Sequence, residues 1–370
     1  MIKIKEVLTK NDFKVFVKFP FKLYKDSKFW APPITSEELK ILDKKNNPVF
    51  KNADAKFYLA YRGNKVVGRI GAMINWIEVK KLSKPKVRFG WYDVVDDFNV
   101  SKLLIEKVIE YGKENNLSFV EGPVGFSNLD KAGLLTYGFN ELNTMITLYN
   151  FPYYEKHLKK LKFKIHAEWV EYEIKIDSFE ESPEKIKKIS EIIQKRYKLK
   201  VIHFKSTKQI IPYVDKMFKL LSQSYNQLQT FVPIQDYQIN YYKKKYFKYL
   251  NPDFIKCIKD DKDELIGFII AMPSFAKALK KANGSFFPLG FLHILKARYL
   301  YNDKASFYLM GIHPSYQNKG IPAIILNEVQ KLLNSKGIKL IETNPELIEN
   351  EAIQRLWKNY NHRIHKKRAT

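Results

Sequence analysis

Residues 313–322 have the types and the spacing that suit the binding of a phosphorylated ligand. They join an apolar run, 305–312, which predicts a strand, to a run at 323–336 whose apolar residues recur at helical spacing. Between these two elements, Gln317 precedes Gly320 by three positions. A turn of this kind presents unpaired backbone N–H groups at the positive end of a helix, where phosphate oxygens bind. The sequence therefore predicts a phosphate site at this junction.

The hexapeptide Gln317-Asn318-Lys319-Gly320-Ile321-Pro322 resembles the pyrophosphate loop of the GNAT acyltransferase superfamily, whose signature is Gln/Arg-x-x-Gly-x-Gly/Ala. Pro322 departs from this signature; proline fits the first turn of a helix, although it removes one N–H donor. The resemblance implies that the ligand is a coenzyme A thioester, either acetyl-CoA or a longer acyl-CoA, used as a substrate. It also implies which residues hold that ligand: Gly311 and Ile312 for the thioester oxygen and pantetheine, Gln317 for the turn, and Asn318, Lys319, Gly320, Ile321 and Ala323 for the pyrophosphate.

The reaction that the resemblance implies is transfer of an acyl group from coenzyme A to an amine acceptor by direct attack. Such a reaction needs a proton acceptor for the amine and a proton donor for the leaving thiolate. Glu342, on a predicted strand, and His313, directly after the motif strand, are the two alternatives for the catalytic base. His313 also fits an ordinary turn residue, because it precedes a proline. Cys257 lies on a predicted hairpin strand, and we expect it in the core.

In relatives of this superfamily, a tyrosine protonates the thiolate within an Asn-x-x-Ala-x-x-x-Tyr arrangement. Here residues 350–352 are Asn-Glu-Ala, and Trp357 stands near the place of the tyrosine. Tyr360 is the available substitute, and Trp357 suits packing against pantetheine or the core. Asn344 and Asn350 suit hydrogen bonds to the pantetheine amides, and capping of the following helix is the alternative role.

The chain repeats one plan twice, which predicts a tandem duplication. In each half a hairpin is followed by a strand that feeds a helix and then by a short buried strand. These segments are 57–61, 66–74, 88–95, 100–113 and 117–121 in the first half, and 254–258, 265–272, 305–312, 323–336 and 338–343 in the second. The predicted fold class is therefore α/β (α+β), and the resemblance makes it two tandem GNAT-like mixed-sheet domains.

A Ser-Pro-containing, acidic break at 178–184 separates the predicted domains, 1–177 and 178–370. The alternating run 169–176 predicts a strand that closes the first domain. The chain ends at residue 370, which leaves little room for the closing strands of the second sheet. We therefore expect a strand from the first half or from a partner to complete that sheet.

The first half carries Asp96-Asp97-Phe98-Asn99 where the second half carries the phosphate motif. Two carboxylates repel a pyrophosphate, and aspartates at a helix start are typical of capping. We therefore expect the first domain to be degenerate: it has lost cofactor binding and is structural, or it forms one wall of the acceptor pocket. Its glycine-rich stretch, 120–128, either lines that pocket or is a tight loop.

The chain carries 65 Lys and Arg against 39 Asp and Glu, a formal charge of +26. Such a charge suits polyanionic partners, although biased base composition explains it equally well. No basic motif interleaved with aromatic residues points to nucleic acid, and the histidines and the single cysteine lack metal-ligand spacing. We therefore expect neither nucleic acid nor a metal, and the oligomeric state is left open. The single cysteine and the lack of an apolar leader predict a cytoplasmic protein.

Residues 274–301 form an insertion that an ordinary GNAT fold lacks. The insertion contains five basic residues, no acidic residue, and many apolar and aromatic residues. This composition suits peripheral contact with the inner membrane face, or a lid over a long apolar acyl chain. The alternative is that the insertion packs on the first half. Because bacterial ceramide synthases belong to the same superfamily, the resemblance allows a lipid-like amine as the acceptor.

Two functions are compatible with these observations. The first is an acyl-CoA-dependent N-acyltransferase whose second half is active. The second is a non-catalytic module that binds acyl-CoA or other anions for regulation. Both bind coenzyme A or a similar anion, so only turnover distinguishes them.

Overall fold

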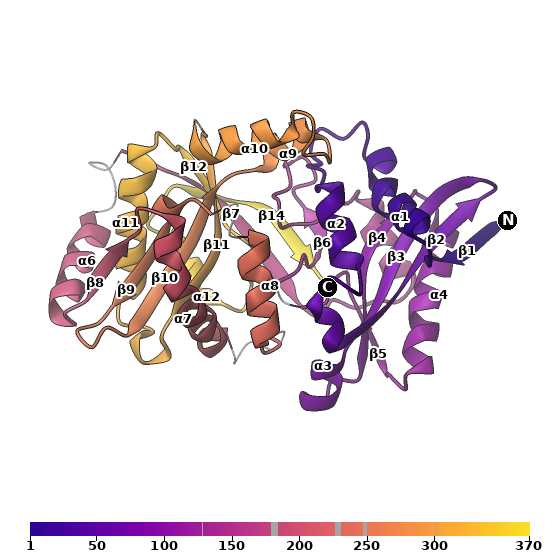
Figure 1. Ribbon diagram of the computed structural model, residues 1–370, viewed down its shortest axis with the longest axis horizontal. Helices are drawn as coiled ribbons and strands as arrows, with labels where there is room; N and C mark the ends of the chain where they lie inside the picture. Colours follow the sequence, from indigo (N-terminus) through magenta and orange to yellow (C-terminus); the bar gives the residue numbers. More distant parts are fainter. Residues whose placement is uncertain (128, 179–183, 226–230, 247–249, 301) are drawn as a thin grey trace. The chain divides into compact units, whose positions relative to one another are not determined.

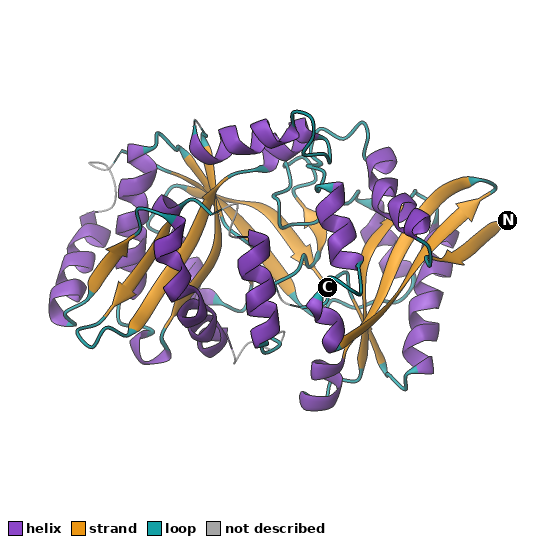
Figure 2. Ribbon diagram, viewed as in Figure 1, coloured by secondary structure: helices purple, strands orange, loops and turns teal. Residues whose placement is uncertain are grey.

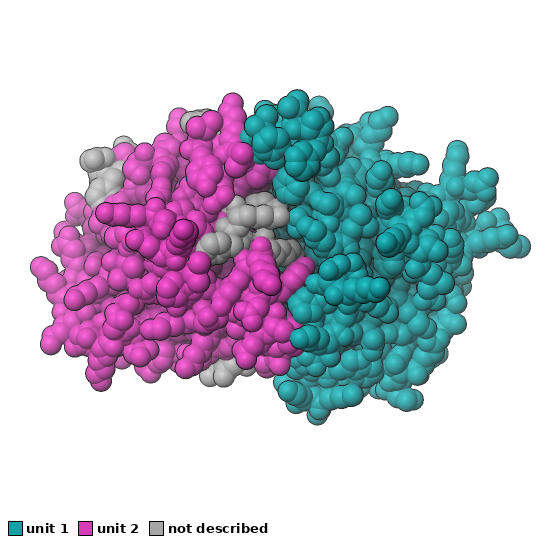
Figure 3. All heavy atoms as spheres, in the orientation of Figure 1, with its two compact units in different colours: residues 1–169, 276–293, 366–370 teal, residues 170–275, 294–365 magenta. Residues whose placement is uncertain are grey.

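The computed structural model describes the chain from residue 1 to residue 370 except for 128, 179–183, 226–230, 247–249 and 301. The predicted domain break at 178–184 therefore lies mostly outside the described residues, as do Asn128 of the glycine-rich stretch and Tyr301 of the insertion. The described chain forms two compact units, which Figure 3 shows in different colours. Unit 1 contains residues 1–169, 276–293 and 366–370, and unit 2 contains 170–275 and 294–365.

The helices and strands are labelled in Figure 1 and coloured by type in Figure 2. The helices are α1 (Lys10–Leu23), α2 (Thr35–Leu42), α3 (Trp76–Lys81), α4 (Phe98–Glu114), α5 (Tyr153–Lys160), α6 (Glu184–Arg196), α7 (Thr207–Tyr225), α8 (Asp236–Tyr246), α9 (Ala276–Ala282), α10 (Gly290–Tyr299), α11 (Ile321–Ser335) and α12 (Glu351–Trp357). The strands are β1 (Ile2–Glu6), β2 (Ala53–Arg62), β3 (Lys65–Asn75), β4 (Lys86–Val94), β5 (Phe119–Glu121), β6 (Leu134–Tyr137), β7 (Glu168–Lys175), β8 (Lys200–His203), β9 (Ile255–Lys259), β10 (Leu265–Pro273), β11 (Lys304–Ile312), β12 (Leu340–Glu342), β13 (Glu346–Leu347) and β14 (His362–Ala369). Both predicted hairpins, β2–β3 and β9–β10, and both strand-to-helix connections, β4–α4 and β11–α11, are confirmed.

Unit 1 is built on a five-stranded mixed sheet in the order β1-β2-β3-β4-β5. Its strands are antiparallel except for β4 and β5, which run parallel. Helix α4 covers one face, where Val100 and Leu104 share a core with Ile70. Helix α1 covers the other face, where the rings of Phe16 and Phe57 meet edge to face. The sheet is therefore buried on both faces, which explains the nearly continuous burial of β3.

Unit 2 is built on a second mixed sheet with the order β6-β14-β7-β12-β11-β10-β9-β8 and β13 beside β7, of which β6 and the end of β14 belong to unit 1. β11 and β12 are parallel, whereas β7 pairs antiparallel with β12 and β10 pairs antiparallel with β9 and β11. Helices α6 and α11 cover one face, where Ile186, Ile269 and Ile324 belong to one core. Helix α7 packs on β10 and β11. The predicted fold class, α/β with two mixed sheets, is confirmed.

Two strand predictions differ from the structure. The run predicted to close the first domain forms β7, but this strand pairs with β12 of unit 2. Its alternate residues Val170, Tyr172 and Ile174 belong to the unit 2 core, which explains the apolar alternation in the sequence. The end of the chain does contain a strand, β14, whose last residues pair with β6 in unit 1. A strand from the first half thus completes the second sheet, as expected, and the predicted boundary at residue 177 stays a prediction.

The insertion forms α9 and α10. Residues 276–293 belong to unit 1, where the N–H of Thr35 donates to the Gly284 carbonyl at 2.9 Å. A Cβ on Gly284 would lie 2.3 Å from the ring of Phe21, so this turn lies directly against α1. The alternative that the insertion packs on the first half is therefore confirmed for α9 and the turn that follows it. Among the described helices, none is long and apolar enough to cross a membrane.

Candidate active site

Strand β11 and its parallel neighbour β12 diverge along their length. The two strands pair only where Lys304, Ala305 and Ser306 lie opposite residues 340–342. On its other edge β11 pairs with β10 as far as Ile312, with a bulge next to Leu309. The second half of β11 therefore has one edge that pairs with β10, while β12 lies away from its other edge. We call this second edge the departed edge.

Side chains from the end of α7 bond the carbonyl groups on that departed edge. The Tyr225 hydroxyl donates to the Met310 carbonyl at 2.9 Å, and the Ser224 hydroxyl donates to the Ile312 carbonyl at 2.7 Å. In a strand, the N–H and C=O of one residue point to the same edge. Because the His313 N–H bonds the Ile266 carbonyl, Gly311 and His313 point toward β10, and the N–H groups of Met310 and Ile312 face the opposite edge, which is the opening. Carbonyl groups of a ligand that lies along this edge can accept hydrogen bonds from the N–H groups of Met310 and Ile312.

Gly311 alternates with these residues and faces β10, where it lies opposite Phe268. A Cβ at this position would lie 2.6 Å from Cε1 of the Phe268 ring. The glycine therefore lets the ring pack against the strand beside the opening. A direct contact of Gly311 with pantetheine stays a prediction.

The loop predicted to hold the pyrophosphate begins with a hydrogen bond from the His313 N–H to the Ile266 carbonyl, at 2.8 Å. A single 3-10 turn, Pro314–Tyr316, follows, and Asn318 and Gly320 then adopt left-handed backbone conformations with φ of 61° and 80°. The amides of Gln317, Lys319 and Ala323 donate to carbonyls within the loop. Those of Asn318, Gly320 and Ile321 have no acceptor among the described residues. Asn318 and Gly320 precede α11 and Ile321 is its first residue, so the positive end of the helix dipole adds to the attraction of these amides for an anion.

Gly320 is required by its backbone and by its neighbours. Its positive φ disfavours any residue with a Cβ, and a Cβ would lie 3.1 Å from Cγ1 of Ile193 on α6. The ammonium of Lys319 lies 5.1 Å from the Tyr316 ring centroid and 5.5 Å from that of Tyr197. No acidic residue occurs between positions 304 and 327, so the loop and the strand before it carry positive charge only.

The structure gives the two predicted bases different surroundings. Glu342 is 2% exposed, and its Oε1 accepts hydrogen bonds from the hydroxyls of Ser274 at 3.1 Å and Ser306 at 3.2 Å. His313 is partly exposed, and its Nδ1 accepts the N–H of Ser315 at 3.3 Å, as a turn residue does. Glu342 therefore lies at the point where β11 and β12 part, and His313 lies at the far end of β11.

The other predicted site residues lie around the second half of β11. The Asn344 side chain donates to the carbonyl of Tyr308, so it links the chain after β12 to the departed edge of β11. Asn350 begins α12 but makes no capping hydrogen bond with its side chain. Burial raises the pKa of Tyr360 to about 12, which keeps its hydroxyl protonated at neutral pH. Cys257 is fully buried on β9, as expected.

Glu346 is a candidate that the sequence analysis missed. It lies on β13, 8% exposed, and both of its carboxylate oxygens lie 3.1 Å from Nε1 of Trp357. Burial raises the pKa of Glu346 to about 8, although hydrogen bonds from Trp357 and Thr343 act in the opposite direction. Burial, and then the nearby charge of Glu346, raise the pKa of Tyr225 to about 12. Glu346 therefore lies within electrostatic reach of the hydroxyl that bonds the Met310 carbonyl.

The sequence contains one signal that points to Glu346. It follows the buried strand β12 by a few residues, at the carboxyl end where parallel strands of a sheet present functional groups. Its burial depends on Trp357, which is 2% exposed and packs in the core beside Phe307. The prediction that Trp357 packs in the core is thus confirmed.

Comparison with known proteins adds three likenesses, although no family model matches the chain. Protein YghO of Escherichia coli K12 is 25% identical over 323 residues, which cover 87% of this chain and 81% of that protein. A protein named bacterial ceramide synthase, from Caulobacter vibrioides, is 22% identical over 364 residues, which cover 95% of this chain and 92% of that protein. A solved structure of a tandem GNAT protein from the clavulanic acid biosynthesis pathway superposes with a TM-score of 0.57 at 10% identity, covering 100% of this chain and 97% of that one. The chain has the tandem GNAT fold.

The tandem GNAT fold provides a second copy of the diverging strands, in unit 1. There β4 pairs with β5 only where residues 86–88 lie opposite residues 119–121, so the register matches that of β11 and β12. Beyond this point the chain around Val124 lies against β4. The N–H of Val124 donates to the Phe89 carbonyl at 2.8 Å, and a Cβ on Gly90 would lie 2.4 Å from the Val124 carbonyl oxygen. The glycine-rich stretch is thus a tight loop packed on β4.

The far end of β4 is filled by α5. The Tyr153 hydroxyl donates to the Val94 carbonyl at 2.6 Å, and the Val94 N–H donates to the Tyr154 hydroxyl at 2.9 Å. Asp97 then caps α4, since its side chain accepts the Asn99 N–H at 2.8 Å. The prediction that the aspartate caps the helix is confirmed.

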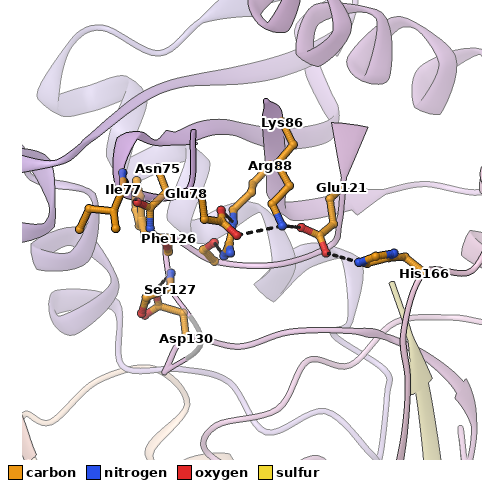
Figure 4. Close-up of polar contacts among 11 residues, drawn as sticks. Asn75, Ile77, Glu78, Lys86, Arg88, Glu121, Phe126, Ser127, Asp130 and His166 are labelled. Atoms are coloured by element: carbon orange, nitrogen blue, oxygen red, sulfur yellow. Dashed lines mark hydrogen bonds and ion pairs between the residues drawn. The ribbon is translucent and has the colours of Figure 1, made fainter. Parts of the chain in front are cut away.

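The start of β4 carries buried charges, which Figure 4 shows in close-up. Glu78, 1% exposed, lies 2.7 Å from Arg88 and 2.9 Å from Lys86, and Lys86 also pairs with Glu121. Burial acts to raise the pKa of Glu78, but the charges of Arg88 and Lys86 outweigh it and lower the pKa. Arg88 donates to the Gly125 carbonyl at 3.0 Å, so the ion pairs also hold the glycine-rich loop in place.

Proposed function

We propose that unit 2 binds a coenzyme A thioester and transfers its acyl group to an amine. The observation that carries this proposal is the open edge of β11 leading to unpaired amides at the start of α11. An extended pantetheine arm suits the edge, where the Met310 and Ile312 N–H groups meet its polar atoms. The pyrophosphate suits the amides of Asn318, Gly320 and Ile321, with Gln317, Lys319 and Ala323 completing the loop. Asn344 and Asn350 remain proposed partners of the pantetheine amides.

We assign the proton acceptor for the amine to Glu346. Its raised pKa places it near the pH at which a general base works well, and it lies within electrostatic reach of Tyr225. Glu342 and His313 remain alternatives: Glu342 accepts hydrogen bonds from two hydroxyls, and Nδ1 of His313 accepts the N–H of Ser315. For the thiolate, Tyr225 and Tyr360 are both protonated donors at neutral pH.

The acceptor is proposed to be an amine with a lipid-like chain. The similarity to a protein named bacterial ceramide synthase supports this choice, as does the apolar character of the insertion. Acyl chain length follows from the same experiment that tests the cofactor.

The test is a thermal-shift series with coenzyme A, acetyl-CoA and long-chain acyl-CoA, followed by an assay of thiol release with and without amines. Saturable stabilisation by coenzyme A together with amine-dependent thiol release supports the proposal. Stabilisation without thiol release for any amine tested favours the non-catalytic binding module. If no coenzyme A derivative raises the unfolding temperature, the proposal fails.

A further inference from the structure

Helix α10 exposes four of its five large apolar side chains and buries the small Gly290 and Ala297. Gly290, Ile294 and Ala297 are buried, whereas Phe291, Leu292, Leu295 and Tyr299 are exposed. The exposed four recur at spacings of three and four residues, so they form one stripe along the helix. A helix whose function is only to pack on its own protein has the opposite distribution.

The loop before α10 and the residue after it extend this stripe. Phe287, Leu289 and Leu300 are also exposed, and together the seven side chains are between 36% and 77% exposed. The rings of Phe287 and Phe291 lie 5.9 Å apart, so part of the cluster is already packed together. We call these seven residues the α10 apolar surface. Scattered apolar side chains are normal on a protein surface, but a contiguous group indicates a binding surface.

The charge around the α10 apolar surface identifies its partner. Lys277, Lys280 and Lys281 are exposed on α9, and Lys296 is exposed on α10 beside Leu292 and Leu295. No acidic residue occurs between Glu264 and Asp303. Exposed aromatic and leucine side chains with lysines and no carboxylates are the pattern of a helix that lies in the surface of an anionic bilayer.

A second copy of this chain suits the surface less well. A symmetric dimer would place the α10 apolar surface of each copy against the same surface of the other. The lysines of both copies would then come together without any acidic residue of the segment to pair with them. A bilayer with anionic headgroups supplies both the apolar depth and the negative charge.

We infer that the α10 apolar surface, with the lysines of α9 and α10, docks the protein on an anionic lipid bilayer without spanning it. The inference is independent of the proposed acyl transfer, because none of these residues takes part in the β11 opening or the 313–322 loop. The rigid attachment of the Gly284 turn to Phe21 and Thr35 holds the base of the segment while its apolar side chains enter the interface.

The experiment is flotation of the full chain with vesicles of phosphatidylcholine alone and of phosphatidylcholine mixed with phosphatidylglycerol. Binding is expected only to the mixed vesicles, and it should weaken as salt is added. The triple variant Phe287→Ser/Leu289→Ser/Leu292→Ser should lose roughly 100-fold in partitioning. Lys281→Gln/Lys296→Gln should lower partitioning by roughly 25-fold, on the order of fivefold per lysine.

The matched control is Leu8→Ser/Ile165→Ser/Ile192→Ser, which removes three exposed apolar side chains outside the α10 apolar surface. It should bind like the unchanged protein, and all variants should keep their unfolding temperature because the altered side chains are exposed. Equal binding by the triple variant and the control overturns the inference, and so does equal binding to neutral vesicles. A dimer that the triple variant abolishes, without vesicle binding, assigns the surface to a second copy and also overturns it.

Discussion

Strands β4 and β11 occupy the same place in their units and end in different ways. In unit 1 both polar groups of Val94 are bonded by tyrosines of α5, and a loop bonds the carbonyl of Phe89. In unit 2 side chains of α7 bond only the carbonyls of Met310 and Ile312. Their N–H groups face the edge of β11 that does not pair with β10.

A diverging pair of strands is therefore not by itself a binding site. The same three-residue register of parallel pairing opens both sheets. What decides the outcome is whether side chains and loops of the protein satisfy the backbone groups that the divergence leaves unpaired. In unit 1 the tyrosines of α5 bond both polar groups of Val94, whereas in unit 2 the side chains of α7 bond the carbonyls of Met310 and Ile312.

The largest effect is expected from Gly320→Glu, which gives the second loop the charge and the bulk of the first. The carboxylate repels the pyrophosphate and the left-handed backbone is strained, so coenzyme A affinity should fall by roughly 1000-fold or more. Calorimetric titration measures the loss. The control is Gly337→Glu at the other end of α11, where φ is 67° and no atom lies within 4 Å of an added Cβ. If the control loses affinity equally, the loop is not the binding site.

The second effect concerns catalysis. Glu346→Gln should lower kcat by roughly 100-fold while coenzyme A binding persists, because a general base is removed. In the unchanged protein, kcat/KM should rise with pH up to about 8, since the base must lose its proton. Glu349→Gln, at an exposed carboxylate nearby, is the matched control. If Glu342→Gln removes the pH dependence and Glu346→Gln does not, the base is Glu342.

The same carboxyl group makes stability depend on pH. The folded protein holds the Glu346 proton more tightly than the unfolded chain does, because burial raises its pKa. This contribution is complete below the ordinary glutamate pKa and is lost as pH rises through about 8. The unfolding temperature of the unchanged protein should therefore fall more over this range than that of Glu346→Gln. Parallel curves for the two proteins contradict the assignment.

Removing a tyrosine that bonds β4 in unit 1 should lower the stability of the protein without lowering its affinity for coenzyme A. Tyr154→Phe leaves the Val94 N–H and the Tyr24 hydroxyl without the partner that they have at 2.9 and 2.8 Å. The free energy of unfolding should drop by about 2 kcal/mol, measured by urea titration, with coenzyme A affinity unchanged. Tyr137→Phe, at a half-exposed tyrosine of the same unit, should cost nothing measurable. Gain of coenzyme A binding by unit 1 would show that the tyrosine was blocking a working site.

The smallest effect is expected at the helix cap of unit 1. Asp97→Ala removes the acceptor of the Asn99 N–H, and the loss should be about 1 kcal/mol in the free energy of unfolding. Asp26→Ala, at an exposed aspartate, is the control. A change in coenzyme A affinity on Asp97→Ala would contradict the structural role assigned to this loop.

Local patterns predicted much of this molecule. The hairpins, the helix after each diverging strand and the cap at Asp97 all follow from residues close together in sequence. The sheet to which β7 belongs could not be predicted, because alternation shows that one face is buried and does not name the partner strand. The side chains that bond the carbonyls of β11 could not be predicted from the sequence either, because Tyr225 lies 85 positions before Met310.

The chain passes several times between the two units, so a cut at one position separates segments that belong to the same unit. The chain changes unit four times, after residues 169, 275, 293 and 365. A cut at 177 separates β7 from β12, with which it pairs, and separates β6 from the last residues of β14. Arg368, buried with its guanidinium on the Leu148 carbonyl at 2.7 Å, would be lost from unit 1 as well. We therefore expect a chain cut at residue 177 to leave β7 and the end of β14 without the strands with which they pair.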